Sequence, residues 1–121
     1  MPTITDVVRK FLNDPEKITD VFQSQKEYYF RYGSHCFSIT KRTQEIQKYG
    51  NYSLYVYPKW SGDTQALAES FLNGDPENMV EMVAYHLKDM PELYADFSKL
   101  YRLLEEKDLK IDEIFKDVLE S

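Results

Sequence analysis

The segment between Glu27 and Tyr57 contains three short runs in which large apolar residues occupy every second position. A period of two places successive side chains on opposite faces of a β-strand, so each run predicts a strand with one apolar face. The alternating apolar residues are Tyr28, Phe30, Tyr32, Phe37, Ile39, Tyr52, Leu54 and Val56. Gly33-Ser34 favours a turn after the first run, and Pro58 ends the third. Three successive strands most simply form an antiparallel meander.

Apolar residues on both sides of this segment follow the three- and four-residue spacing of amphipathic helices. Before it, we expect one helix that begins at Thr3 or Thr5 and a second, short helix that begins at Pro15. After it, helical patterns begin near Asp63, Asp75, Pro91 and Asp108. The expected fold class is therefore α+β: a three-stranded antiparallel sheet at about 27–58, preceded by two short helices and covered on one face by about four C-terminal helices.

The length of 121 residues suits one domain, so we expect residues 1–121 to form a single α+β domain with its own core. Cys36 is the only cysteine, which excludes an intramolecular disulfide. The first residues lack the basic start and apolar run of a signal peptide, and no apolar stretch approaches the roughly 20 residues that span a bilayer. These features predict a cytoplasmic protein that has no membrane partner.

Charge and aromatic residues are distributed unevenly along the chain. Seven of the ten tyrosines and the single tryptophan lie between Gln25 and Trp60, where six basic side chains face two acidic ones. From residue 61 onward, fifteen acidic side chains face six basic ones, and the formal net charge of the whole chain is −6. The aromatic, basic middle suggests a binding surface, whereas the acidic helices would repel a long polyanion.

Strand parity separates the apolar set from a second face of the sheet. That second face contains Tyr29, Arg31, Ser38, Thr40, Arg42, Ser53, Tyr55 and Tyr57. If it is open, its aromatic and basic members form a candidate binding surface, namely Tyr29, Arg31, Arg42, Tyr55 and Tyr57. Tyrosine and arginine are enriched where the binding energy of protein interfaces concentrates. The plainer alternative is that tyrosines favour strands and keep their rings half-buried there.

The sequence therefore predicts a small non-catalytic protein that binds and regulates another protein, with the profile of inhibitors, immunity proteins and antitoxin-like adaptors. The acidic helix faces are an alternative surface for a basic partner. The alternative function is a nucleotide- or single-stranded nucleic-acid-binding module that uses the same sheet face, where rings would stack on bases and Arg31 and Arg42 would meet phosphate. We expect no cofactor, because the four glycines form no phosphate-binding loop.

The candidate catalytic groups are His35, Cys36 and His86, and none of them supports an enzyme strongly. Adjacent residues on a strand point to opposite faces, so His35 and Cys36 cannot easily share a proton. His86 lies in the apolar line of a predicted helix, where a core or boundary histidine is common. A pair formed by the distant Cys36 and His86 stays a minor alternative. Two histidines and one cysteine without clustered carboxylates predict no metal site.

Overall fold

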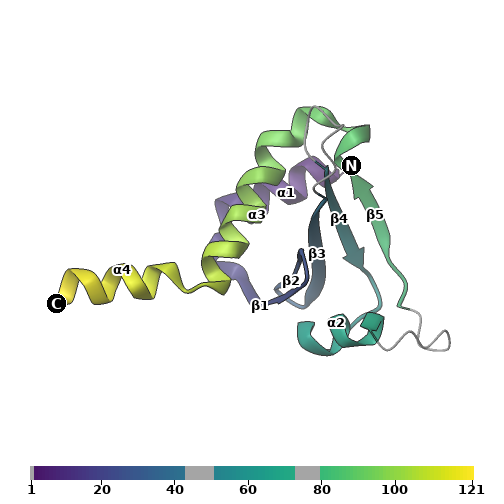
Figure 1. The fold of residues 1–121 in the computed structure, drawn as a ribbon. Helices are drawn as coiled ribbons and strands as arrows, with labels where there is room; N and C mark the ends of the chain where they lie inside the picture. Colours follow the sequence, from purple (N-terminus) through teal and green to yellow (C-terminus); the bar gives the residue numbers. More distant parts are fainter. Residues whose placement is uncertain (1, 43–50, 73–79) are drawn as a thin grey trace.

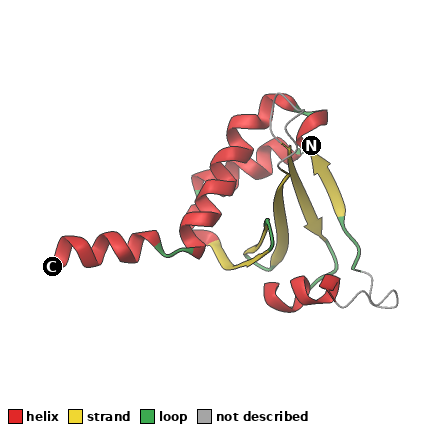
Figure 2. Cartoon of the chain, in the orientation of Figure 1, coloured by secondary structure: helices red, strands yellow, loops and turns green. Residues whose placement is uncertain are grey.

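The computed structural model describes residues 2–42, 51–72 and 80–121, and it shows an α+β fold with an antiparallel sheet (Figures 1 and 2). Within these residues the sheet has five strands, ordered in space as they follow one another in the chain. They are β1 (Ile18–Ser24), β2 (Glu27–Tyr32), β3 (His35–Arg42), β4 (Asn51–Tyr57) and β5 (Val83–His86). All neighbouring strands are antiparallel, so the predicted three-stranded meander gains one strand at each edge.

Helices lie on both faces of the sheet rather than on one (Figure 1). α1 (Ile4–Asn13) and α3 (Tyr94–Asp108) pack on one face, whereas α2 (Thr64–Leu72) packs on the other. α4 (Ile111–Glu120) follows α3 and extends away from the sheet. Short 3-10 turns occur at η1 (Pro15–Lys17), η3 (Leu87–Asp89) and η4 (Pro91–Leu93). The expectation that about four C-terminal helices cover one face is therefore wrong in number and in placement.

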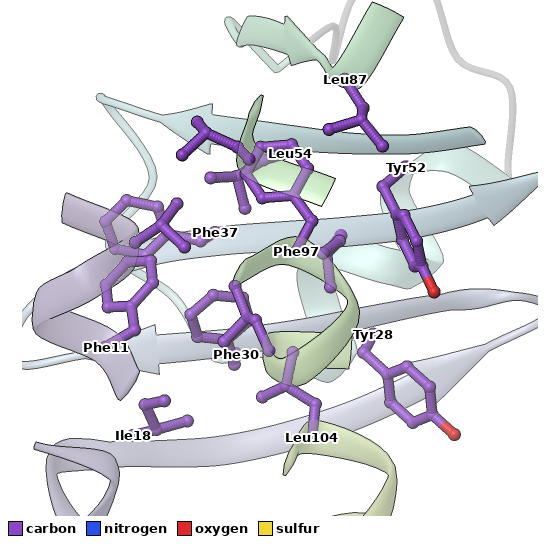
Figure 3. Packing of buried hydrophobic residues seen from close by; sticks show 14 residues of the cluster. Phe11, Ile18, Tyr28, Phe30, Phe37, Tyr52, Leu54, Leu87, Phe97 and Leu104 are labelled. Carbon is purple, nitrogen blue, oxygen red and sulfur yellow. The ribbon is translucent and has the colours of Figure 1, made fainter. Parts of the chain in front are cut away.

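The main core lies between the sheet and the layer formed by α1 and α3 (Figure 3). Phe11 of α1 packs edge-on against two strand rings, with its centroid 5.2 Å from that of Phe30 and 4.9 Å from that of Phe37. The parity prediction is confirmed on this face. Its buried members are Tyr28, Phe30, Phe37, Ile39, Tyr52 and Leu54, with Tyr32 and Val56 packed against them.

The first helix begins with a capping box. Thr3 Oγ1 accepts a hydrogen bond from the Asp6 backbone amide (3.3 Å), and the Asp6 carboxylate accepts one from the Thr3 amide (3.0 Å). These reciprocal bonds satisfy amide groups that a helix start otherwise leaves unpaired. Thr3, rather than Thr5, is therefore the cap.

The second predicted helix is wrong, because its residues form the edge strand β1 after the turn η1. A bulge in β1 gives its apolar residues the spacing of a helix; these residues are Ile18, Val21 and Phe22. The register of β1 against β2 shifts around Asp20, which has a φ of 53°. A bulge inserts one extra residue into a strand. Consequently Ile18 and Val21 both contact the main core, and Phe22 contacts the opposite cluster beneath α2.

The helix predicted from Asp75 is also wrong in its described part. Residues 83–86 form β5, which pairs with β4, and the next three residues form the turn η3. β5 pairs with the backbone groups at the edge of β4, and this long-range pairing outweighs the local helical spacing. The start of this predicted helix and the polar connection predicted after β3 fall within 73–79 and 43–50, which lie outside the described residues.

Substitution of one leucine in each helix tests whether α3 is buried and α4 is exposed. Leu100 is fully buried in α3, whereas Leu119 of α4 is 85% exposed. We expect Leu100→Ala to lower the free energy of unfolding by about 2–5 kcal/mol, because truncation leaves a cavity in the core. Leu119→Ala should change it by less than about 0.5 kcal/mol. Urea unfolding followed by circular dichroism measures both, and equal losses in the two variants would contradict the exposed position of α4.

Candidate functional site

The predicted binding residues on β2 and β4 lie on the sheet face opposite the main core, and α2 covers part of that face. Tyr29 and Tyr57 are buried in contact with α2, at 4% and 3% exposed, whereas Tyr55 and Arg31 are partly exposed. Arg42 is the last residue of β3, and its side chain lies outside the described residues. The structure therefore brings the three tyrosines together beside a helix, in place of a flat and fully open surface.

The bulge in β1 fixes α2 to the sheet. The backbone amide of Thr64 donates a hydrogen bond to Asp20 Oδ2 (2.9 Å), and the Thr64 hydroxyl donates one to the Asp20 carbonyl oxygen (2.7 Å). Thr64 is fully buried, so water does not compete for these bonds. Asp63 caps the helix by accepting a hydrogen bond from the amide of Ala66 (2.7 Å). The position of Asp20 thus determines which part of the sheet α2 covers.

The guanidinium of Arg31 is used inside the protein. Its Nη1 donates to the carbonyl oxygen of Gly62 (3.2 Å), and its Nη2 donates to that of Ser34 (3.4 Å). The Cys36 thiol donates to the same Gly62 oxygen (3.8 Å). Burial raises the pKa of this thiol, which disfavours the thiolate that a nucleophilic cysteine needs. These bonds hold the loop that leads from β4 into α2.

A pocket of about 320 Å³ opens between the β1–β2 turn, β4 and α2. Four aromatic rings line it, those of Tyr29, Tyr55, Tyr57 and Phe71, and Met82 lies at its border before β5. The ring centroids of Tyr29, Tyr57 and Phe71 lie 6.0–6.4 Å from one another. Ligand pockets commonly measure about 300–1,000 Å³. This pocket therefore suits a small group or a single side chain better than an extended ligand.

Glu27 is the one charged residue among the described residues that line this pocket. The Ser38 hydroxyl donates to Glu27 Oε2 (2.5 Å) and lies 2.7 Å from the Tyr57 hydroxyl. Because a hydroxyl carries one proton, Tyr57 donates to Ser38, which in turn donates to the carboxylate. Burial raises the pKa of Glu27, although the hydroxyls of Ser38, Tyr29 and Tyr57 favour its charged form. No ion pair within the described residues involves this carboxylate.

Glu27 and Phe71 are pocket residues that the predicted site lacks. Glu27 stands two positions before Tyr29 on the same strand, so strand parity alone could have placed both on one face. Phe71 has the spacing of a core residue in a helix, and no sequence signal distinguishes it from one. It reaches Tyr29 because the bulge at Asp20 holds α2 over that face.

A second candidate surface is the apolar stripe of α4. Its members are large and exposed, namely Ile114 (50%), Phe115 (61%), Val118 (64%) and Leu119 (85%). With Ile111 they follow the spacing of one face of an amphipathic helix. Such a stripe is ordinarily buried against a neighbour, and contiguous exposed apolar surface marks interaction sites. In the part of the chain that the structure describes, no element covers this face of α4.

The candidate catalytic residues are not assembled into a site. Cys36 pairs with Tyr57, whereas His86 pairs with Ser53, so Cys36 and His86 lie toward opposite ends of β4. His86 Nδ1 is 2.8 Å from the Ser53 hydroxyl oxygen. Among residues 2–42, 51–72 and 80–121, no three histidine, cysteine or carboxylate side chains are placed to hold a metal ion. No helix in these ranges has the length and apolar character needed to cross a membrane.

Comparisons with protein-family models, with curated proteins and with solved structures gave no match. The function is therefore inferred from the geometry of this chain, above all from the pocket beneath α2 and the apolar stripe of α4.

The raised pKa of Glu27 predicts a specific pH dependence of stability. Its carboxyl keeps a proton in the folded state at pH values where the unfolded chain has lost it, so the free energy of unfolding falls as pH rises between the two pKa values. Glu27→Gln removes this contribution. The stability of the variant relative to the wild type should therefore increase as pH rises from about 4 toward neutral, since glutamate has an ordinary pKa of about 4.3.

Urea unfolding of both proteins across this pH range measures the difference. Glu69→Gln, which removes an exposed carboxylate from α2, is the control for losing one negative charge in the same region. A stability difference that falls with rising pH would show that Glu27 is stabilised in its charged form, contrary to the geometry described above.

Proposed function

We propose that this protein is a non-catalytic binding protein that regulates a basic partner protein by docking the apolar stripe of α4 into an apolar groove. The observation that carries the proposal is the exposure of Ile114, Phe115, Val118 and Leu119 on one face of a helix that extends away from the sheet (Figure 1). An amphipathic helix laid into a groove is a recurring mode of protein recognition. The anchors of such a helix have the spacing that α4 shows.

The charge around the stripe favours a basic partner. The polar positions of α4 carry four carboxylates and one lysine, listed in order as Asp112, Glu113, Lys116, Asp117 and Glu120. At the base of α4, a second pocket of about 410 Å³ is lined by further acidic side chains from Glu16 and Glu106 beside Lys107 and Lys110. A groove edged with lysine or arginine would complement this surface and speed association.

The aromatic sheet face supports protein binding through a smaller area. Its partly exposed members are Tyr55 and Arg31, and the other two described members, Tyr29 and Tyr57, are buried. A nucleotide or single-stranded nucleic acid at this face is the less supported alternative. Glu27 gives the pocket a carboxylate that repels phosphate, and the guanidinium of Arg31 already bonds Gly62 and Ser34.

A double substitution on α4 tests the proposed function. Val118→Asp with Leu119→Asp places charge on the stripe, and the high exposure of both residues means that the fold should be retained. The matched control is Ala95→Asp, which adds a carboxylate to an exposed position of α3. The partner is first captured from the native cell extract with the wild-type chain, and the affinity of the purified partner is then measured by calorimetry at increasing salt.

We expect the double substitution to weaken binding by at least about tenfold, the control to leave it unchanged, and added salt to reduce affinity. Chemical cross-links should join Lys116 or the neighbouring carboxylates of α4 to basic residues of the partner. If sedimentation shows that the stripe instead joins two copies of this chain, or if the double variant binds the partner normally, the proposed function is wrong.

A further inference from the structure

We propose that the pocket beneath α2 binds a methylated ammonium group, of the kind carried by choline-like amines and by trimethylated lysine. This site is separate from α4, so the proposal does not depend on the function proposed above. The pocket combines four aromatic rings with one carboxylate. Aromatic faces attract cations through their quadrupole, and a carboxylate adds direct charge complementarity.

The rings of the pocket wall differ in exposure: Phe71 is 38% exposed and Tyr55 is partly exposed, whereas Tyr29 and Tyr57 are 4% and 3% exposed. Tyr29, Tyr57 and Phe71 form a group in which each centroid lies 6.0–6.4 Å from the other two, and Tyr55 adds a fourth ring to the pocket wall. Cation–π attraction acts within about 6 Å of a ring centroid. A pocket of about 320 Å³ accepts a group of that size and leaves little room for a nucleotide.

The negative charge of Glu27 favours a positively charged ligand. Among the described residues that line the pocket, Glu27 is the charged one, and no ion pair between described side chains neutralises it. Burial of a carboxylate is unfavourable for the folded protein unless a partner compensates it, which agrees with the raised pKa of Glu27. A bound cation would remove this unfavourable contribution. An anionic or neutral ligand would leave it in place.

The hydrogen bonds of Glu27 favour a methylated ammonium over a primary one. Ser38 donates to its Oε2, the Tyr29 hydroxyl also favours the carboxylate, and Tyr57 acts through its hydrogen bond to Ser38. The Ser38 hydrogen bond uses part of the acceptor capacity of the two carboxylate oxygens, which have about four lone-pair sites between them. A primary ammonium would bring three further N–H donors that need acceptors, whereas a quaternary ammonium has none. The methylated group therefore gains the attraction of the charge and of the rings without leaving buried donors unpaired.

The experiment is a titration of the full chain with choline, followed by the ring resonances of Tyr29 and Tyr57 in nuclear magnetic resonance spectra. The matched ligand is 3,3-dimethylbutan-1-ol, which has nearly the same shape as choline and no charge. We expect saturable shifts of both tyrosines with choline, and affinity for the neutral analogue about two- to thirtyfold lower. This comparison needs no substitution, so it holds even where a pocket variant fails to fold.

Two variants identify the groups that bind. Phe71→Leu keeps an apolar side chain but removes a ring, and Glu27→Gln removes the charge but keeps the shape. Each should weaken choline binding by about two- to thirtyfold. The matched control is Phe115→Leu, which removes an exposed ring from α4 and should leave binding unchanged. Equal binding of choline and its neutral analogue, or shifts confined to residues outside the pocket, would overturn the proposal.

A third arm distinguishes the two sources of the ligand. The probes are free choline and a short alanine–glycine peptide that carries one trimethyl-lysine. Affinity for the peptide at least about tenfold above that for choline assigns the site to a modified protein, and equal affinities assign it to a small amine. Either result supports the ammonium site. Equal binding of the same peptide with unmodified lysine contradicts the preference for a methylated group.

Discussion

The alternation of side chains along β2, β3 and β4 is the constraint on which the structure depends. Each strand sends one half of its residues toward α1 and α3 and the other half toward α2. Tyr28 and Phe30 belong to the main core, and Tyr29 between them belongs to the opposite cluster. A one-residue shift in pairing would move every side chain of a strand to the opposite face of the sheet. Burial of the two clusters therefore stabilises the same strand register. The core and the pocket are therefore consequences of one pairing pattern.

The second determinant is the bulge at Asp20. It supplies a carboxylate and a carbonyl oxygen to Thr64 at the start of α2, and in that position α2 buries Tyr29 and Tyr57 and brings Phe71 beside them. In this arrangement the face contains a small pocket beside Glu27, and four large apolar side chains of α4 are exposed instead.

The sequence allowed the fold class, the three central strands, the capped first helix and the apolar parity of the sheet to be predicted, because each follows from local spacing. It did not allow the edge strands to be predicted. The bulge gave Ile18, Val21 and Phe22 a helical spacing, and β5 forms by pairing with β4, which is distant in the sequence. In the candidate site, too, the features set by local spacing were predictable and those set by long-range contacts were not. Tyr29, Tyr55 and Tyr57 were predictable from parity, whereas Phe71 and the exposed α4 depend on tertiary placement that local spacing does not encode.

The position of α2 closes the sheet face over Tyr29 and Tyr57, and titration of these two tyrosines is a direct measure of that closure. Burial raises the pKa of Tyr29 and of Tyr57 far above the ordinary value of about 10. Ring resonances assigned with Tyr29→Phe and Tyr57→Phe can be followed as pH rises. We expect neither ring to ionise near pH 10, and we expect both resonances to change when the protein unfolds at higher pH. Ionisation of both rings near pH 10 in the folded protein would show that the face is open, and would contradict the pocket.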